Sequence, residues 1–484
     1  MIKLNKETYL DKLHACWLGK SIGGTMGAPY EGSRDFLDIK GFSSPSGEPL
    51  PNDDLDLQLV WLNAVESEGI RNINANILGE YWLDWISPHW NEYGIAKTNL
   101  RLGLLPPVSG EFDNDKWKTS NGAWIRSEIW AGLAPCAVDV AVKYASMDAM
   151  VDHGLGEGTY AEIFTSAMQS AAYYESDIKT LLKIALAKIP ESTMIHKTVS
   201  LVMDCYEKGI DYKETREKIV EFNKELGWFQ APNNLGFVAI GLLYGEKDFK
   251  KSLIYTINCA DDTDCTAGTV GATLGIIGGV SAIPDELKSY VGDRIITVTI
   301  NGMYNEFIPD TCTTLTNRIV ALVPSVMKAN DVKLELCEGK SELTQNELDA
   351  INVLGSDDFL DRSPYSYDYT YGRSLNVRVE MDKTPRVKPL EKRQIKLTFY
   401  CGHKCLITRK LELKFIMPDG FVAEGYERII TLPYPQPLHN IYGIESTSFT
   451  VTIGEKIEAV NRCYVEVTSN NNSTPLMIPL VFIG

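Results

Sequence analysis

The chain has 484 residues, of which 44% are hydrophobic and 23% charged, and its formal net charge at pH 7 is −17. This length exceeds that of a usual single hydrophobic core, so we expect two domains, and the apolar content excludes bulk disorder. The acidic balance opposes binding to nucleic acid or anionic lipid. The start is polar, and no segment approaches the roughly 18 apolar residues of a membrane span. We therefore expect a cytoplasmic protein without nucleic-acid or membrane partners.

The first part of the chain, from residue 6 to about residue 330, repeats its apolar residues with the period of an α-helix. Tyr9, Leu13 and Trp17 share one face of the first segment. Asn52 or Asp53 is a good N-cap for a helix over residues 55–66, and Pro190 separates two later helical segments. These signals predict an all-α domain over residues 1–335.

A glycine-rich segment, residues 19–32, ends the first predicted helix. Its glycines do not follow the phosphate-loop order Gly-x₄-Gly-Lys-Ser/Thr, and no strand is predicted before them. The segment instead favours close packing against another helix, followed by a loop that presents Glu31.

Two adjacent carboxylates, Asp53 and Asp54, follow Asn52 at the predicted start of the second helix. One carboxylate at this place caps the helix and interacts favourably with its dipole. Two in a row, preceded by Asn, exceed what a single cap needs.

A second acidic segment, Asp261-Asp262-Thr263-Asp264-Cys265, leads directly into an apolar stretch rich in Gly and Ala. Carboxylates this close raise one another's pKa unless a cation neutralises them. Carboxylate, amide and hydroxyl oxygens with few His or Cys nearby are typical of a site for Mg²⁺, Mn²⁺ or Ca²⁺. The two acidic segments, about two hundred residues apart, therefore predict one shared metal cluster.

After about residue 330 the pattern changes to short alternating runs rich in β-branched and aromatic residues. These runs predict an antiparallel β-sandwich over residues 367–484, joined to the helical domain by a linker over residues 336–366. The predicted strands cover residues 375–381, 394–400, 411–416, 427–432, 448–453, 460–468 and 476–482.

A basic run, residues 383–396, is the clearest positive segment of this C-terminal part. It contains Arg386, Lys388, Lys392 and Arg393 and alternates with apolar residues. The alternation favours the solvated face of a strand over a polyanion site.

Ten Cys residues are scattered singly along the chain, in neither a disulfide framework nor a zinc pattern. The closest spacing, Cys401-Gly-His-Lys-Cys405, lacks a second Cys/His pair at matching distance. We interpret that segment as structural or incidental.

Three segments, residues 19–32, 51–56 and 259–268, resemble in order and separation the ADP-ribosylglycohydrolase family, which includes the dinitrogenase reductase-activating glycohydrolases. That family has a glycine-rich helix ending in Pro-x-Glu, a Thr-Asp-Asp segment and a late Gly-Asp-Thr-Asp-Thr segment. Further likenesses lie at residues 119–126, 151–153 and 229–234. The resemblance spans about residues 10 to 330 and does not include the β-rich part.

The resemblance implies an orthogonal all-α helical bundle that hydrolyses an ADP-ribosyl or related ribosyl or glycosyl bond with two Mg²⁺ or Mn²⁺ ions. Carried over by position, one ion is held by Asp53, Asp54 and Asp264. The second ion is held or adjoined by Asp262, Asp264 and Glu31, and the flanking metal-site positions are Asn52 and Cys265. The implied catalytic residues are Glu31, Asp53 and Asp262, with either Glu31 or Asp53 as general base. The implied substrate contacts are Ser120, Asn121, Gly122 and His153.

Three positions depart from the family pattern. Gly24 stands where the family has Asp, Asn52 replaces Thr, and Cys265 replaces the final Thr of the late motif with a softer ligand. Three explanations are open for the loss of this threonine as a metal ligand. Thr266 or water takes its coordination place, only one ion binds tightly, or the chain binds its ligand without catalysis. The first is favoured because all four central aspartates are present.

Other functions remain as alternatives to an ADP-ribosyl hydrolase. A small riboside or another glycoside suits the same chemistry of metal and sugar, and a non-catalytic nucleotide- or sugar-binding protein is a second class. A nucleoside-hydrolase-like enzyme with one Ca²⁺ is expected to be α/β, which disagrees with the helical periods. The expected partner is therefore a small-molecule glycoside or an ADP-ribosylated substrate, with the oligomeric state left open.

Overall fold

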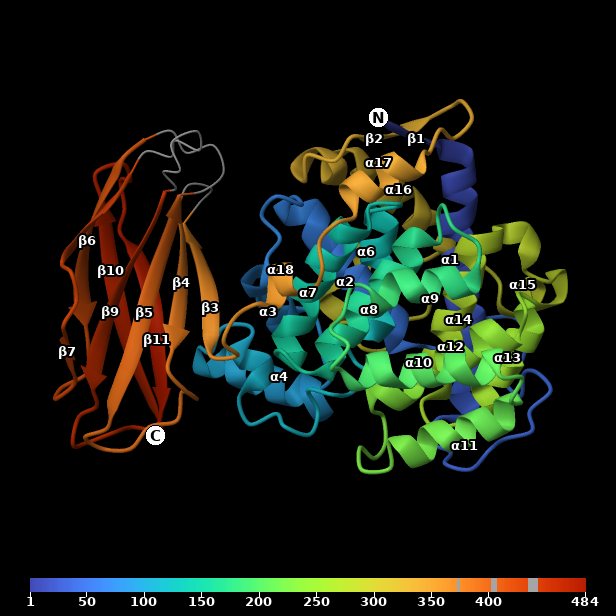
Figure 1. Cartoon of the computed structure of the whole chain (residues 1–484), viewed down its shortest axis with the longest axis horizontal. Helices are drawn as coiled ribbons and strands as arrows, with labels where there is room; N and C mark the ends of the chain where they lie inside the picture. Colours follow the sequence, from blue (N-terminus) through green and yellow to red (C-terminus); the bar gives the residue numbers. More distant parts are fainter. Residues whose placement is uncertain (372–374, 402–406, 434–442) are drawn as a thin grey trace. The chain divides into compact units, whose positions relative to one another are not determined.

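The computed structural model describes residues 1–371, 375–401, 407–433 and 443–484 (Figure 1). The chain forms two compact units, one made of Met1–Gly94 with Asn114–Asp361 and the other of Ile95–Asp113 with Arg362–Gly484. The first is helical and the second is built mainly of strands, which confirms the predicted fold class. In the described part of the chain, no helix has the length and apolar character needed to cross a membrane.

The helical unit contains most of the helices and one short parallel pair of strands, β1 (Ile2–Asn5) and β2 (Leu334–Cys337). Its helices are α1 (Lys6–Gly27), α2 (Asp53–Glu68), α3 (Ala75–Asp84), α6 (Glu128–Leu133), α7 (Val138–His153), α8 (Glu157–Ala171), α9 (Ile178–Leu186), α10 (Met194–Glu207), α11 (Tyr212–Phe222), α12 (Ala231–Tyr244), α13 (Phe249–Asn258), α14 (Thr263–Gly278), α15 (Asp285–Val291), α16 (Cys312–Ala329), α17 (Gln345–Ile351) and α18 (Asp357–Leu360). Four short 3₁₀ turns are η1 (Ala28–Tyr30), η2 (Trp124–Arg126), η3 (Val280–Ala282) and η4 (Gly302–Phe307).

Helices α1 and α14 pack together at the centre of this unit and are buried along most of their length. Gly19, Gly23 and Gly27 recur every fourth residue on the face of α1 that meets α14. A Cβ atom at Gly19 or Gly23 would lie less than 3.0 Å from the main-chain oxygen of Gly271 or Ala267, respectively. Only glycine permits this approach, so the predicted role of the glycine-rich segment in close helix packing is confirmed.

The predicted helix boundaries are also confirmed at two places. The Asn52 side chain accepts a hydrogen bond from the Asp54 main-chain N–H at 2.7 Å, which makes Asn52 the N-cap of α2. Pro190 lies between the end of α9 and the start of α10. Both features depend on local backbone chemistry, so they can be predicted from a few neighbouring residues of the sequence.

The β unit is a sandwich of two sheets with strand orders β11-β10-β6-β8 and β3-β4-β5-β9-β7. Alternate residues of the strands point inward, as in β4, where Leu375, Val377, Val379 and Met381 are buried. The strands are β3 (Ser366–Tyr371), β4 (Leu375–Met381), β5 (Lys392–Cys401), β6 (Arg409–Ile416), β7 (Val422–Glu424), β8 (Ile429–Leu432), β9 (Ile444–Thr452), β10 (Val460–Ser469) and β11 (Leu476–Ile483).

All seven predicted strands are present, and among the described strands of the β unit the pattern missed β3 and β7; the short strands β1 and β2 of the helical unit were not predicted either. Strands β3 and β7 each lie at an edge of the five-stranded sheet. An edge strand has one neighbour only, and the three residues of β7 include none that is fully buried, so β7 carries no clear alternation. The segment from residue 401 to residue 405, interpreted above as structural or incidental, lies outside the described residues apart from Cys401.

A helical segment far from the β-strands in sequence belongs to the β unit. Helix α4 (Asn91–Leu102) runs into this segment, which includes α5 (Val108–Glu111). Leu104, Val108 and Phe112 join the hydrophobic core between the two sheets. Residues 336–361, expected as a linker, instead belong to the compact helical unit, where Leu348 and Leu360 are buried.

The basic run over residues 383–396 is not a simple solvated strand face, which corrects the prediction. Arg393 is fully buried, its Nε donates to Asp382 Oδ1 at 2.8 Å, and its guanidinium lies 5.8 Å from the centre of the Phe482 ring. Arg386 forms an ion pair with Asp113 of the helical segment. Two of the arginines therefore hold the β unit together.

Candidate active site

Five carboxylates from three segments of the helical unit come together at one place. Glu31 follows η1 at the end of α1, Asp53 and Asp54 begin α2, and Asp262 and Asp264 lie at the start of α14. The close packing of α1 on α14 places the first and last of these segments side by side. Ligand atoms of Glu31, Asp262 and Asp264 lie within 4.8 Å of one another, and so do those of Asp54, Asp264 and Cys265.

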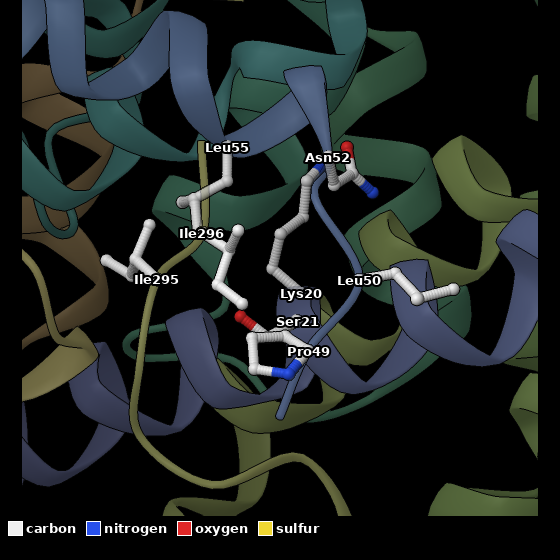
Figure 2. A pocket seen from close by; sticks show the side chains of 8 residues that line it. All are labelled: Lys20, Ser21, Pro49, Leu50, Asn52, Leu55, Ile295 and Ile296. Carbon is white, nitrogen blue, oxygen red and sulfur yellow. The ribbon is translucent and has the colours of Figure 1, made fainter. Parts of the chain in front are cut away.

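The two sequence departures at Gly24 and Asn52 occupy the same space. A Cβ atom at Gly24 would lie less than 3.0 Å from Asn52 Nδ2. The Asn52 side chain therefore fills the volume beside α1 that a side chain at position 24 would need. Lys20 and Asn52 also line a small cavity of about 10 Å³ whose other walls are Ser21, Pro49, Leu50, Leu55, Ile295 and Ile296 (Figure 2).

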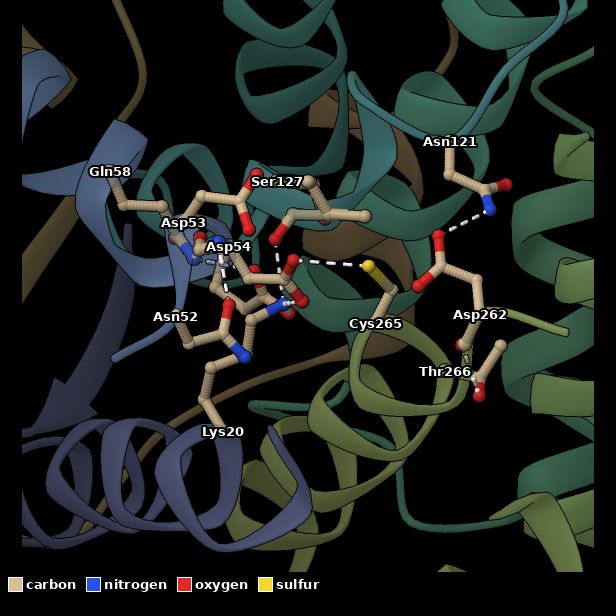
Figure 3. Close-up of polar contacts among 12 residues, drawn as sticks. Lys20, Asn52, Asp53, Asp54, Gln58, Asn121, Ser127, Asp262, Cys265 and Thr266 are labelled. Atoms are coloured by element: carbon tan, nitrogen blue, oxygen red, sulfur yellow. Dashed lines mark hydrogen bonds and ion pairs between the residues drawn. The ribbon is translucent and has the colours of Figure 1, made fainter. Parts of the chain in front are cut away.

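Asp54 is fully buried, with a hydrogen bond to one carboxylate oxygen and an ion pair at the other (Figure 3). The Cys265 thiol donates to Oδ1 at 3.1 Å, and the Lys20 ammonium lies 3.3 Å from Oδ2. Lys20 also forms an ion pair with Glu128 at 3.3 Å. Burial by itself lowers the pKa of Lys20, but the Glu128 and Asp54 charges more than offset this effect and raise it. Lys20 therefore remains a buried cation.

Asp262 is held by polar partners from two other segments. The Asn121 amide Nδ2 donates to Asp262 Oδ2 at 2.7 Å (Figure 3), and Asn234 Oδ1 accepts from the Asp262 main-chain N–H at 3.3 Å. Among the described residues, the second oxygens, Asp262 Oδ1 and Asp264 Oδ1, are buried without a hydrogen-bond partner. Buried acceptors without partners are costly and indicate a missing cation or donor.

Burial dominates the acid–base behaviour of the cluster. It raises the pKa of Asp54 and Asp262 well above the ordinary value, and with the charges of Glu31 and a neighbouring aspartate it raises the pKa of Asp264 to about 7. Burial and the nearby aspartates raise the pKa of Glu31 as well. Burial also raises the pKa of the Cys265 thiol, which keeps its proton. The cluster carries more acid groups than the described cations compensate.

Asp53 is half-buried, and the Tyr93 hydroxyl donates to its Oδ2 at 3.2 Å. Glu31 is exposed. These two carboxylates are therefore the members of the cluster that solvent reaches most easily.

The predicted substrate-contact residues form a buried layer behind the acidic cluster. His153 is fully buried; its Nε2 lies 3.1 Å from Ser120 Oγ, and its Nδ1 lies 3.0 Å from Asp152 Oδ1. Among the described residues, Asn121 is the only one of these predicted contacts that donates a hydrogen bond to the acidic cluster. A Cβ atom at Gly122 would lie less than 3.0 Å from Glu92 Oε1, so a larger residue here would displace the Glu92 side chain.

The Ser120–Gly122 layer is fixed from behind by a buried arginine. Arg126 donates to the Gly122 carbonyl and forms ion pairs with Asp148 at 2.9 Å and Asp152 at 2.8 Å. The Arg126 and His153 charges hold the pKa of Asp152 at about 2, against the effect of its burial. This network holds the loop that carries Asn121.

A cavity of about 170 Å³ is lined in part by Asp261, the chain neighbour of Asp262, and by Ser33, two residues after Glu31. The Arg34 guanidinium lies 3.9 Å from the centre of the Trp228 ring, and both residues line the cavity. Asn233, also in the lining, is 7% exposed, and its Oδ1 has no hydrogen-bond partner among the described residues. Asp261 has a φ of 68°, a strained conformation for a residue other than glycine.

Sequence reasoning missed Lys20, Glu128 and Tyr93, which contact or support the acidic cluster. Lys20 had a recognisable signal, because a charged residue beside Gly19 on a close-packed helix face must be buried with a partner. Glu128 and Tyr93 had none, since their neighbours in space are distant in sequence.

The model of the ADP-ribosylglycohydrolase family matches residues 5–317. A search of curated proteins returns no match.

Solved structures similar to the chain include one described as an ADP-ribosylglycohydrolase-related protein complex, 16% identical, with a TM-score of 0.45 over 66% of this chain and 99% of that one. Another is a FixG-related protein from Vibrio parahaemolyticus, 10% identical, with a TM-score of 0.18 over 23% of this chain and 95% of that one. A third is the GAE domain of GGA2p from Saccharomyces cerevisiae, 14% identical, with a TM-score of 0.16 over 25% of this chain and 96% of that one. The family match spans well over half of the chain and includes every carboxylate of the cluster, and on this ground the chain belongs to the ADP-ribosylglycohydrolase family.

Proposed function

We propose that the chain is a divalent-metal-dependent glycohydrolase that cleaves an ADP-ribosyl or related ribosyl or glycosyl bond at the acidic cluster. The observation that carries this proposal is the pair of buried oxygens, Asp262 Oδ1 and Asp264 Oδ1, which lack hydrogen-bond partners among the described residues. They lie in the same group as the Glu31 carboxylate.

The residues of the cluster fit a hard divalent cation. Oxygen ligands, mainly carboxylates, are those that Mg²⁺ and Mn²⁺ prefer. Glu31, Asp262 and Asp264 would hold one ion, and Asp54, Asp264 and Cys265 form the group available to a second, for which the resemblance implies Asp53, Asp54 and Asp264. A bound ion would orient the sugar hydroxyls and lower the pKa of a bound water.

Glu31 is the stronger candidate for general base. It is exposed to solvent, and a general base must lie within hydrogen-bond reach of the water that it activates. Asp53 already accepts a hydrogen bond from Tyr93. We therefore assign it the role of accepting a hydrogen bond from a hydroxyl of the sugar. The negative charge of both carboxylates stabilises the oxocarbenium-like centre that forms as the glycosidic bond breaks.

Asn121 and His153 act as positioning residues in this proposal. Asn121 orients Asp262 by donating to its Oδ2, and its own Oδ1 accepts from Trp124 Nε1 at 3.0 Å. His153 orients Ser120 from a fully buried place, which favours this role over stacking on the ligand. Ser120 and Gly122 shape the wall of the site.

The cavity beside Asp261 receives the part of the substrate beyond the cleaved bond. Trp228 offers a ring for stacking, and Arg34 and Asn233 offer polar side-chain atoms. Asn233 Oδ1 has no hydrogen-bond partner among the described residues. Trp228→Ala is expected to raise KM at least fivefold while kcat changes little, because the contact is made in ground state and transition state alike. An unchanged KM would remove the cavity from the substrate site.

The proposal is tested by turnover of metal-stripped protein with and without added Mg²⁺ or Mn²⁺. The substrates are ADP-ribosyl-arginine, ADP-ribosyl-serine, simple nucleosides and aryl glycosides, and release of the free sugar is followed. Metal-dependent release from any of them supports the proposal and identifies the leaving group. If the protein binds the metal but releases sugar from none of these substrates, the proposed substrates are contradicted and a binding protein is favoured.

A further inference from the structure

The Lys20 ammonium occupies a fixed place beside Asp54. Lys20 is 1% exposed, and its Nζ donates to the Ile125 carbonyl at 2.6 Å and pairs with Glu128 and Asp54 at 3.3 Å each. The Ile125 carbonyl and Glu128 Oε1 accept hydrogen bonds from two of the three N–H donors of this ammonium, and Asp54 is its ion-pair partner. Two acceptors besides Asp54 therefore hold the ammonium in this place.

Glu128, the second anion at Lys20, is itself held in place. Gln169 Nε2 donates to Glu128 Oε1 at 3.0 Å, and Gln58 Nε2 donates to Oε2 at 2.9 Å. Glu128 therefore stays beside Lys20, which keeps the ammonium within reach of Asp54.

The two potential metal groups differ in how far their ligand atoms are already engaged. In the first, Asp54 Oδ1 accepts a hydrogen bond from the Cys265 thiol, and Oδ2, which has no hydrogen-bond partner among the described residues, lies 3.3 Å from the Lys20 ammonium. In the second, Asp262 Oδ1 and Asp264 Oδ1 are buried and have no partner among the described residues. A cation arriving at the cluster meets free acceptors in the second group and a positive charge beside the first.

The part of α1 that lies nearest the cluster, from Gly19 to Gly27, contains no acidic residue. Gly24 carries no carboxylate, and the space beside it holds the Asn52 amide. The small cavity next to Lys20 and Asn52 has no acidic residue in its lining (Figure 2). The absence of an acid at position 24 and the presence of a buried lysine at position 20 therefore both disfavour the binding of a cation at Asp54.

We propose that the Lys20 ammonium takes the place of one metal ion at Asp54, so that this chain binds a single divalent cation tightly. That cation is held by Glu31, Asp262 and Asp264. The inference rests on the metal dependence of the proposed function and concerns the number of ions and the residue that replaces the second.

The first experiment counts Mn²⁺ ions in the full-length protein. Native mass spectrometry and titration calorimetry of metal-stripped protein are expected to give one Mn²⁺ per chain. The electron paramagnetic resonance spectrum at saturating Mn²⁺ is expected to show an isolated ion. Two tightly bound equivalents, or the spectrum of a spin-coupled pair, would overturn the proposal, and so would the absence of any binding.

Variants at position 20 identify the residue responsible. Lys20→Met removes the charge beside Asp54 and is expected to allow a second Mn²⁺ to bind at least tenfold more tightly than in the unchanged protein. Lys20→Arg keeps the charge and is expected to keep one ion. Lys40→Met, which removes an exposed ammonium paired with Asp38, is the matched control and should also keep one. If Lys20→Met does not fold, the ion count and spectrum of the unchanged protein decide the question.

Metal counting and turnover separate this inference from the proposed function. One bound ion without release of sugar from any substrate contradicts the proposed function and leaves the role of Lys20 standing. Two bound ions with turnover contradict the role of Lys20 and leave the glycohydrolase standing.

Discussion

The thiol of Cys265 donates a hydrogen bond to Oδ1 of Asp54 over 3.1 Å. The residue at the position where the family has a threonine thus donates a hydrogen bond to a buried carboxylate. Because burial raises the pKa of this thiol, the sulfur is neutral and is a poor ligand for Mg²⁺. Cys265 accordingly supports the acidic cluster through a hydrogen bond.

Replacing Cys265 tests this role. Cys265→Ser keeps a donor and is expected to leave the Mn²⁺ affinity within about threefold, while Cys265→Ala strands the Asp54 oxygen and lowers the free energy of unfolding by about 1–3 kcal/mol. Calorimetric titration and chemical denaturation measure the two effects. If Cys265→Ser instead shifted the preference from Cd²⁺ to Mg²⁺, sulfur would be a metal ligand after all.

Loss of a central carboxylate should remove hydrolysis without unfolding the protein. Asp262→Asn and Asp53→Ala are each expected to lower kcat/KM by at least about 100-fold, because charge stabilisation at the breaking bond is lost. Asp115→Asn, at an aspartate whose side chain is 97% exposed, is the control. Circular dichroism should be unchanged in all three. Full activity in either site variant would contradict the proposed active site.

The contact between α1 and α14 should not tolerate a methyl group. Gly23→Ala places a Cβ against the Ala267 carbonyl and is expected to lower the free energy of unfolding by about 1–3 kcal/mol or more, because the two helices must separate. Gly339→Ala meets nothing within 4 Å and serves as the control. Thermal unfolding of both variants checks this; equal melting temperatures would argue against the close packing.

Asp56 should make stability depend on pH. Burial raises its pKa from 3.8 to about 7, even though its Oδ2 accepts the N–H groups of Val298 and Thr299. The folded chain therefore binds this proton more tightly than the unfolded chain does. Its contribution to stability is present below about pH 4 and is lost as the pH rises through 7.

The variant Asp56→Asn isolates this effect, because an amide oxygen accepts the same hydrogen bonds without titrating. Between pH 5 and 8.5, the melting temperature of the unchanged protein is expected to fall by several degrees relative to that of the variant. Parallel melting curves across this range would show that Asp56 does not titrate as described.

Removal of the β-strands alone should harm the helical part. A truncation after Asp361 leaves Leu104, Val108 and Phe112 without the sandwich core that buries them, so we expect aggregation. Changing all three to Ser in the truncated chain should restore a monodisperse protein, as measured by light scattering. A truncated chain that is monodisperse without those changes would contradict this account.

Much of the architecture could be predicted from local patterns. The helical period, the caps at Asn52 and the break at Pro190 all depend on neighbours within one or two turns, and alternation revealed the central strands of the sandwich for the same reason. The acidic segments were visible too, because bunched carboxylates beside helix starts have a cost that a reader of the sequence can recognise.

Sequence by itself therefore determined the two kinds of secondary structure, the family resemblance and the residues that make up the acidic cluster. Only the tertiary structure decided which cation meets Asp54, that Arg393 is buried and that Leu104, Val108 and Phe112 join the β core. The reason is physical: periodicity records which side of an element is buried, whereas the partner of a buried charge or apolar face comes from a distant part of the chain. Lys20 and Glu128, 108 positions apart, become neighbours only through folding.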